Sequence, residues 1–480
     1  MSYQAIVFLC GAVLAALVLW LFRKNKKNLS IVLKILTVIF CAIGFVRFFL
    51  SDAILFSING GWYESGYYEN PDFLHVILRW GYFTNYSVLP VAVFCGGRFF
   101  KNVAGYFSLP FTVISTVFFD DYMTYFLDPK GEGYHVDPTF RCVFFVAELV
   151  LAFAIPIILH ISEKHVFNVK RGKEWVRYLI GLPGVILVTM PAYAPQTFWG
   201  TNQKEPEWFE PYHLIWIGIS VLALIVLYYV FRFRTYEERY MLCFFLIVVL
   251  FFHYNSMYLK GLTLSRLPFD LCNLATYLYL IAFLLKSTKM FHFCFIANTI
   301  GTLFAIIIPS FGLGHTGFWN VHFLYQHTLV LIIPFLLMAL RIFPRLTRKS
   351  IGYFFVGFTI YITFCYILGI IINGELNGTD KPIVNWFYMF NFEVAFEEYF
   401  AFLKFIANYH FSFGGGKYIV YPLVYVVVYA GFASICLLFY FIAKKFYKIE
   451  DEWLELRLSA IDLYEKITKK KSKFTRHYID

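Results

Sequence analysis

The chain has 480 residues, of which 60% are hydrophobic, 22% aromatic and only 15% charged. Ordinary globular domains carry about 25% charged residues, so this surplus of apolar residues requires lipid rather than a larger core. The composition excludes a soluble enzyme, and apolar residues that run continuously instead of alternating exclude a membrane β-barrel. The formal net charge of +11 comes from short basic loops between apolar runs, so it indicates membrane topology rather than a nucleic-acid partner.

Thirteen apolar runs are long enough to cross a membrane as helices, at about 20 residues per crossing. The first run is followed, not preceded, by the basic cluster from Arg23 to Lys27, which is the reverse of a secretory signal peptide and predicts an N-terminus outside. The expected fold class is therefore all-α, a polytopic membrane protein with its C-terminus inside. The expected spans cover residues 5–22, 30–50, 75–96, 102–119, 141–161, 176–195, 212–231, 240–258, 267–285, 290–309, 322–340, 351–372 and 418–442.

The loops that this topology places inside are all basic, among them 164–177, 232–239 and 341–349. The opposite loops are longer and richer in acidic, glycine and aromatic residues, as the topology predicts. Beyond the last span, the lysine-rich tail predicts from Ile449 onward a basic amphipathic helix that lies along anionic lipid. A solvated tail is the open alternative.

Two short segments of the first half recur in the second half. Leu21-Phe-Arg-Lys corresponds to Val230-Phe-Arg-Phe-Arg, and Ala154-Ile-Pro corresponds to Ile332-Ile-Pro. The recurrence predicts two parallel six-helix repeats with one extra helix. The expected domains are an N-terminal six-helix membrane repeat at 1–211, a C-terminal seven-helix membrane domain at 212–442 and a basic amphipathic cytoplasmic tail at 443–480.

Polar side chains inside membrane spans are costly and are functional candidates for that reason. The nine cysteines show neither paired nor metal-ligand spacing, so neither a disulfide framework nor a metal site is expected. The sequence shows no nucleotide-binding loop or haem motif, and no cofactor is expected. In the first half the candidates are Arg47, Arg79, Asn85 and Glu148. In the second half they are Asp270, Cys272, Asn273, Asn298, Thr302, His322, Tyr325, Gln326, His327 and Thr328.

Cys272 and His327 stand out among these candidates. Each lies about six residues from the outer end of its expected span, roughly 9 Å deep, and the two spans run in the same direction. A thiol in apolar surroundings is inert unless a base helps to form the thiolate, and histidine does this near neutral pH. A nucleophile pair is one interpretation, and a packing role for Cys272, as one of nine cysteines, is the other.

Two strings of residues resemble a known family. Leu267-Pro-Phe-Asp-Leu-Cys272-Asn-Leu and Phe323-Leu-Tyr-Gln-His327-Thr-Leu-Val-Leu-Ile-Ile-Pro334 resemble the YwaF-type integral membrane family, which is related to the vertebrate transmembrane ether-phospholipid acyltransferase. The resemblance covers about residues 212–442. It implies acyl transfer between glycerolipids, with the acyl group carried as a thioester on Cys272 and with His327 activating the thiol. Asp270 stands where that family commonly has a histidine.

The sequence therefore predicts a membrane acyltransferase that acts on membrane lipids at the outer leaflet of the cell membrane, with the bacterial plasma membrane as the expected location. In the first half, Tyr86 aligns with Cys272 and Leu149 with His327, so that half lacks the pair. A secondary transporter of two parallel repeats is the main alternative, and it predicts ionisable residues at the midplane between the halves. A non-catalytic scaffold or lipid-binding protein is the third hypothesis. The expected substrate-binding residues are Asp270, Asn273, Asn298, His322 and Gln326.

Overall fold

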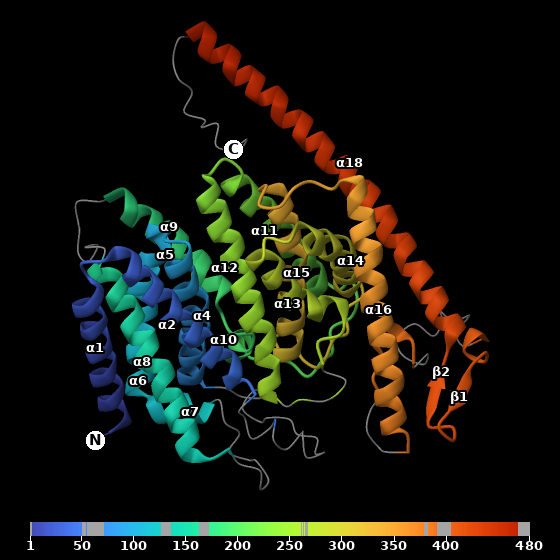
Figure 1. Cartoon of the computed structure of the whole chain (residues 1–480), viewed down its shortest axis with the longest axis horizontal. Coiled ribbons are helices and arrows are strands. Elements are labelled where there is room, and N and C mark those ends of the chain that lie inside the picture. The colour runs from blue at the N-terminus through green and yellow to red at the C-terminus, as the bar shows by residue number, and fades with distance from the viewer. Residues whose placement is uncertain are drawn as a thin grey trace. The chain divides into compact units, whose positions relative to one another are not determined.

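The computed structural model describes residues 2–49, 54, 72–125, 136–162, 172–260, 262, 264, 267–378, 383–390 and 405–468. These residues are helical apart from turns, loops and one short hairpin, and the chain forms two compact units (Figure 1). Unit 1 comprises Met1–Gly218, Tyr236–Leu262 and Pro309–Leu329. Unit 2 comprises Ile219–Thr235, Thr263–Ile308 and Val330–Asp480. The division falls within two helices, α11 (Pro211–Phe231) and α15 (Phe318–Ala339).

Unit 1 is built around α4 (Phe73–Phe94), which contacts α2 (Lys26–Arg47), α6 (Leu109–Val117) and α12 (Tyr236–Asn255). The residues of α4 from Gly81 to Ala92 are all buried, as expected for a helix that others surround. Helix α1 (Tyr3–Phe22) packs along α8 (Pro138–Ser162). The remaining elements of unit 1 are α5 (Arg98–Val103), η2 (Ala104–Ser108), α7 (Phe119–Tyr125), α9 (Gly172–Val188), α10 (Ala194–Trp199) and η3 (Ser256–Lys260).

The expected span at 102–119 is interrupted by one turn of π-helix, η2, between α5 and α6. A buried polar cluster lies at this point. Ser108 donates a hydrogen bond to Oδ1 of Asn85, and Nδ2 of Asn85 donates to Oγ1 of Thr112 at 2.9 Å. A π-helical turn inside a longer helix is rare and frequently lies at a functional site. Through these two hydrogen bonds Asn85 joins α4 to the η2–α6 segment.

Two loops of unit 1 bind each other, and we call residues 200–210 with 309–317 the loop clasp. His315 places Nε2 at 2.6 Å from Oε1 of Glu210, and its backbone N–H donates to Oδ1 of Asn202 at 3.1 Å. Gly314 donates through its backbone N–H to the carbonyl of Lys204 at 3.1 Å. The clasp thereby fixes the chain that leads into α15.

Unit 2 contains α13 (Leu271–Leu284), α14 (Thr288–Ile307), α16 (Arg348–Leu376) and α18 (Pro422–Thr468). Helix α14 is central, because it contacts α13, α16 and α18. The close packing of α14 on α16 depends on Gly357, where a Cβ atom would lie 2.7 Å from the ring of Phe293. Small residues at such crossings allow membrane helices to approach closely.

A two-stranded hairpin interrupts the helical pattern of unit 2, and the sequence interpretation did not include it. Strands β1 (Phe411–Phe413) and β2 (Tyr418–Val420) pair antiparallel, with Phe411 opposite Val420. The turn contains three successive glycines, Gly414 to Gly416, all with positive φ. Aromatic residues on both sides of a glycine turn are a hairpin signal, so the sequence carried this information. A 3₁₀ turn, η5 (Trp386–Tyr388), lies between α16 and the hairpin in the chain.

The expectation of a multi-pass helical membrane protein is confirmed. Within the described ranges, nine helices are long and apolar enough to cross a membrane. The four other expected spans fall on α4, on the α5–η2–α6 segment, on α9 and on the 14-residue α13. Every expected span thus overlaps a helix, although residues 418–420 of the last one form strand β2 and α18 begins only at Pro422. The number of thirteen crossings, the internal repeat and the three-domain division stay predictions. The last part of the expected tail, 469–480, lies outside the described residues.

Candidate functional site

Cys272 is the second residue of α13, at the end of the helix where backbone N–H groups lack helical partners. Asp270 is the N-cap residue, but its side chain does not cap the helix. Instead it accepts a hydrogen bond from Nδ2 of Asn273 at 3.3 Å. Sγ of Cys272 donates to Oδ1 of Asn273 at 3.8 Å. A helix N-terminus carries a partial positive charge, and Cys272 lies in the first turn of α13, two residues after Asp270.

Two neighbouring helices hold the backbone that leads into Cys272. The Tyr361 hydroxyl on α16 donates to the carbonyl of Phe269, and Sγ of Cys365 approaches the same carbonyl at 3.7 Å. From α14, Nδ2 of Asn298 donates to the carbonyl of Leu271 at 3.0 Å. The start of α13 is therefore fixed by side chains from both α14 and α16.

Tyr361 and Cys365 belong to this site although the sequence interpretation did not include them. Tyr361 is buried and interacts electrostatically with both Asp270 and Cys272. The two residues are four apart, so they share one face of α16. Two polar residues four apart within the expected span 351–372 were the sequence pattern that could have identified them. Nothing in the sequence indicated which helix their face would meet.

His327 lies on α15, in the part of that helix that belongs to unit 1. Its Nδ1 is 2.7 Å from the carbonyl oxygen of Phe323, so Nδ1 carries the proton and donates. Its Nε2 is buried and has no hydrogen-bond partner among the described residues. A neutral imidazole in this tautomer presents a lone pair on Nε2, which is the state that a general base requires.

His322 and Gln326, the other expected binding residues on α15, are also buried. The ring of His322 stacks on that of His253 from α12, with centroids 4.5 Å apart and an angle of 17° between the planes. Tyr325 meets the His253 ring edge-on at 4.4 Å. His253 was missed by the sequence interpretation, and its only signal was a histidine inside the apolar run at 240–258.

The structure thus brings four of the expected site residues together in unit 2, namely Asp270, Cys272, Asn273 and Asn298. The three others, His322, Gln326 and His327, lie on the unit 1 part of α15. Cys272 and His327 therefore belong to different units, and their contact stays a prediction.

The polar candidates of the first half include a buried ion pair. Nη1 of Arg47 lies 2.5 Å from Oε2 of Glu148, and each side chain is 2% exposed. The Tyr122 hydroxyl donates to Oε1 of Glu148 at 2.6 Å and accepts from Arg47 at 2.9 Å. The Arg47 guanidinium also lies 3.9 Å from the ring centroid of Tyr82. These contacts join α2, α4, α7 and α8, which is the pattern of a structural network.

Residues that could bind a metal or form disulfides do not gather in the part of the chain that the structure describes. No group of three or more histidine, cysteine, aspartate or glutamate side chains with the arrangement of a metal site occurs there. All nine cysteines are free thiols, and Cys272 is half-buried.

Comparison with known proteins adds one finding about this part of the chain. The family model of the TMEM164 family matches residues 208–441. This is a membrane-protein family, and the match covers just under half of the chain, nearly the same residues that carry the resemblance described above. No curated protein and no solved structure matches the chain significantly. The match therefore links the segment with Cys272 and His327 to a membrane-protein family.

Proposed function

We propose that this membrane protein transfers fatty acyl groups from a phospholipid to a second acceptor at the outer leaflet, through a thioester on Cys272. The observation that carries the proposal is the place of Cys272 in the first turn of α13, where backbone N–H groups lack helical partners and the helix carries a partial positive charge. Such a helix start can stabilise both a thiolate and the oxyanion that forms when the thiolate attacks an ester. The resemblance to lipid acyltransferases supplies the substrate class.

In the proposed reaction His327 acts as the base. Its Nε2 takes the thiol proton, and Sγ of Cys272 attacks the ester carbonyl carbon of the phospholipid. The carbon–oxygen bond of the ester then breaks, and His327 returns the proton to the departing lysolipid oxygen. In the second half-reaction a hydroxyl or amine acceptor loses its proton to His327 and attacks the thioester. The Cys272 thiolate leaves and is protonated again.

The remaining residues of the cluster have supporting roles in this proposal. Asn298 uses its amide N–H₂ group to bind the Leu271 carbonyl, so it acts as a positioning residue. Tyr361 positions the chain in the same way through the Phe269 carbonyl. Asp270, Asn273, His322 and Gln326 are proposed to contact the lipid substrate.

The first test is mass spectrometry of the purified protein after incubation with phospholipid that carries a labelled acyl chain. We expect a hydroxylamine-sensitive acyl adduct on the peptide that contains Cys272. The adduct should be absent in Cys272→Ala and should form or turn over about 10² to 10⁴ times more slowly in His327→Ala. Cys436→Ala is the matched control, because it removes a buried thiol on α18, outside the site, and should keep the adduct. If the wild-type protein forms no adduct with any of several lipid donors, the enzyme hypothesis fails. Transport then becomes the leading hypothesis.

A second test addresses the pairing of the two residues. In the variant His327→Cys, mild oxidation should form a disulfide with Cys272 if the two positions are in reach of each other. The double variant with Cys272→Ser is the control and should give no such bond. A direct Cys272–His327 couple would be contradicted if Cys272→Ser and His327→Cys each lost activity while His327→Cys formed no disulfide. The proposed thioester on Cys272 would still stand.

A further inference from the structure

Helix α18 is much longer than a membrane crossing. Its 47 residues rise about 70 Å, whereas the hydrocarbon core of a bilayer is about 30 Å thick. The expected span ends at residue 442, so the part from 443 to 468 extends about 39 Å further. Figure 1 shows α18 as one continuous helix over this whole length.

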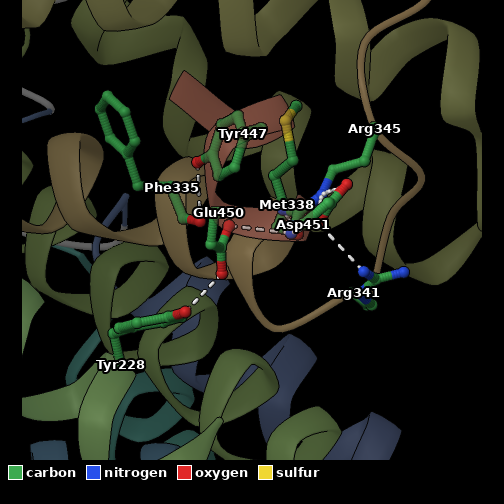
Figure 2. A network of polar contacts seen from close by, with 8 residues as sticks. All are labelled: Tyr228, Phe335, Met338, Arg341, Arg345, Tyr447, Glu450 and Asp451. Carbon is green, nitrogen blue, oxygen red and sulfur yellow. Dashed lines mark hydrogen bonds and ion pairs between the residues drawn. The ribbon is translucent and has the colours of Figure 1, made fainter. Parts of the chain in front are cut away.

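One face of this extension is attached to its own unit by charged and polar contacts. Arg345 donates to Oε2 of Glu450 at 2.8 Å, to Oδ1 of Asp451 at 2.7 Å and to the carbonyl of Met338 at 2.6 Å (Figure 2). Arg341 binds the same Asp451 oxygen at 2.9 Å. The attachment continues with a hydrogen bond from Tyr228 to Glu450 and one from Tyr447 to the carbonyl of Phe335 at 3.3 Å.

Another face of the extension carries an apolar stripe. Its own unit contacts this face where Arg232 lies over the Trp453 ring at 5.2 Å and Arg457 over the Phe233 ring at 4.6 Å. The stripe has a strict spacing of four, three, four, three and four residues, which is the a/d pattern of a coiled coil. All of its members are exposed, and the large ones range from 46% for Trp453 to 73% for Ile467. The stripe consists of Ile449, Trp453, Leu456, Ala460, Leu463 and Ile467.

The charge of the stripe-bearing part of the extension, which begins after the lysines at 444, 445 and 448, argues against a membrane surface as the cover of the stripe. Residues 449–468 carry six acidic and two basic side chains, a net charge of −4; these are Glu450, Asp451, Glu452, Glu455, Asp462 and Glu465 against Arg457 and Lys466. An anionic inner leaflet attracts basic helices and repels acidic ones. The prediction of a lipid-binding tail rested largely on the basic residues at 469–476, and these lie outside the described part of the chain.

We propose that the stripe binds the same stripe of a second copy of this chain, as a parallel two-stranded coiled coil. A shared membrane gives both copies the same orientation, so two helices that leave it on one side must run parallel about a two-fold axis along the membrane normal. The anchored membrane domains also keep the helices at a high effective concentration, which a seam of three heptads needs. This inference is independent of the proposed acyl transfer.

Charge complementarity supports this occupant over other partners. With Trp453 at position a, Glu452 falls at position g and Arg457 at position e, five residues later. In a parallel coiled coil these two positions face each other across the seam, so symmetry creates two Glu452–Arg457 pairs between the copies. Four acidic residues that would repel each other at the seam lie instead at the outer positions c and f, namely Asp451, Glu455, Asp462 and Glu465.

A charge exchange between two differently tagged copies of the full chain tests the proposal. Arg457→Glu alone places glutamates opposite each other, and Glu452→Arg alone places arginines opposite each other. We expect each variant to give several-fold less self-association than the wild-type chain, measured by co-purification of the two tags from mild detergent. The two variants expressed together should pair at the wild-type level, because every contact is then complementary. Recovery in the mixture also shows that both variants fold.

Cross-linking tests the geometry of the seam. Leu463→Cys occupies position d and should form a disulfide-linked dimer on mild oxidation, whereas Glu465→Cys, at outer position f, is the matched control and should not. The wild-type chain provides the background from its nine native cysteines. Equal cross-linking of Leu463→Cys and Glu465→Cys would overturn the proposal. So would a monomeric mass together with equal co-purification of the charge variants whether they are expressed alone or together.

Discussion

Arg47 and Glu148 form an ion pair at 2.5 Å in unit 1 although 101 residues separate them in the chain. Removal of one partner leaves an uncompensated charge at a site where each side chain is 2% exposed. We expect Glu148→Leu or Arg47→Met to lower the free energy of unfolding by about 3–5 kcal/mol. Thermal unfolding of the purified protein in detergent measures this loss.

The double variant Arg47→Met with Glu148→Leu separates a structural role from a chemical one. The double variant leaves no uncompensated buried charge, so it should be more stable than each single variant. Acyl-adduct formation should also return with the fold. A Glu148→Leu protein that unfolds like the wild type but has lost all activity would place the chemistry in the first half of the chain.

The loop clasp depends on a glycine that other residues cannot replace. Gly314 has a φ of +80°, and a Cβ atom there would lie 2.3 Å from Oγ1 of Thr201 and 2.7 Å from the carbonyl oxygen of Asn202. Gly314→Ala should therefore destabilise the clasp by about 1–3 kcal/mol. Faster hydrogen exchange in residues 200–210 would reveal it. Gly312→Ala is the control, because its nearest contacts would be 3.8 and 4.0 Å away and exchange should not change.

Arg345 anchors the extension of α18 through Glu450 and Asp451. Hydrogen bonds to charged partners contribute about 1.5–3 kcal/mol each when they are well shielded, and this arginine is 19% exposed. Arg345→Ala should therefore increase hydrogen exchange over residues 445–455 while the membrane part of α18 keeps its protection. Lys349→Ala, an exposed neighbour, should leave exchange as in the wild type. Unchanged exchange in Arg345→Ala would mean that α18 needs no anchor there.

The segment before Cys272 should lose its fixed position when its supports are removed. Tyr361→Phe deletes the hydrogen bond to Phe269 at a cost of about 1 kcal/mol, and Asn298→Ala leaves the Leu271 carbonyl without its side-chain donor at about 1–3 kcal/mol. Both variants should change the rate at which a maleimide modifies Cys272, measured by peptide mass spectrometry. Thr302→Val is the control, since its hydroxyl bonds only the Asn298 carbonyl of its own helix among the described contacts. Equal rates in all variants would contradict a positioning role.

The amino-acid sequence by itself determined where the membrane helices lie. Each expected span overlaps a helix, as 75–96 does with α4 and 267–285 with α13, although the last span begins in strand β2. Hydropathy predicts such segments because a span must bury its own backbone and carry its own apolar side chains, and both properties are local. The a/d stripe of α18 was also present in the sequence, but the face of that helix that its own unit occupies is shown only by tertiary contacts such as those of Arg345.

Only the tertiary structure decided which polar side chains meet. Tyr361 reaches the Phe269 carbonyl across 92 residues, and His253 stacks on His322 from another helix. A histidine or tyrosine inside an apolar run has the same local pattern whether it faces lipid, a neighbouring helix or a substrate. Its partner depends on the packing angle and rotation of whole helices, which many weak contacts along the chain set together. For that reason the sequence could propose Cys272 as a nucleophile, while its helix start and its supports on α14 and α16 came from the fold.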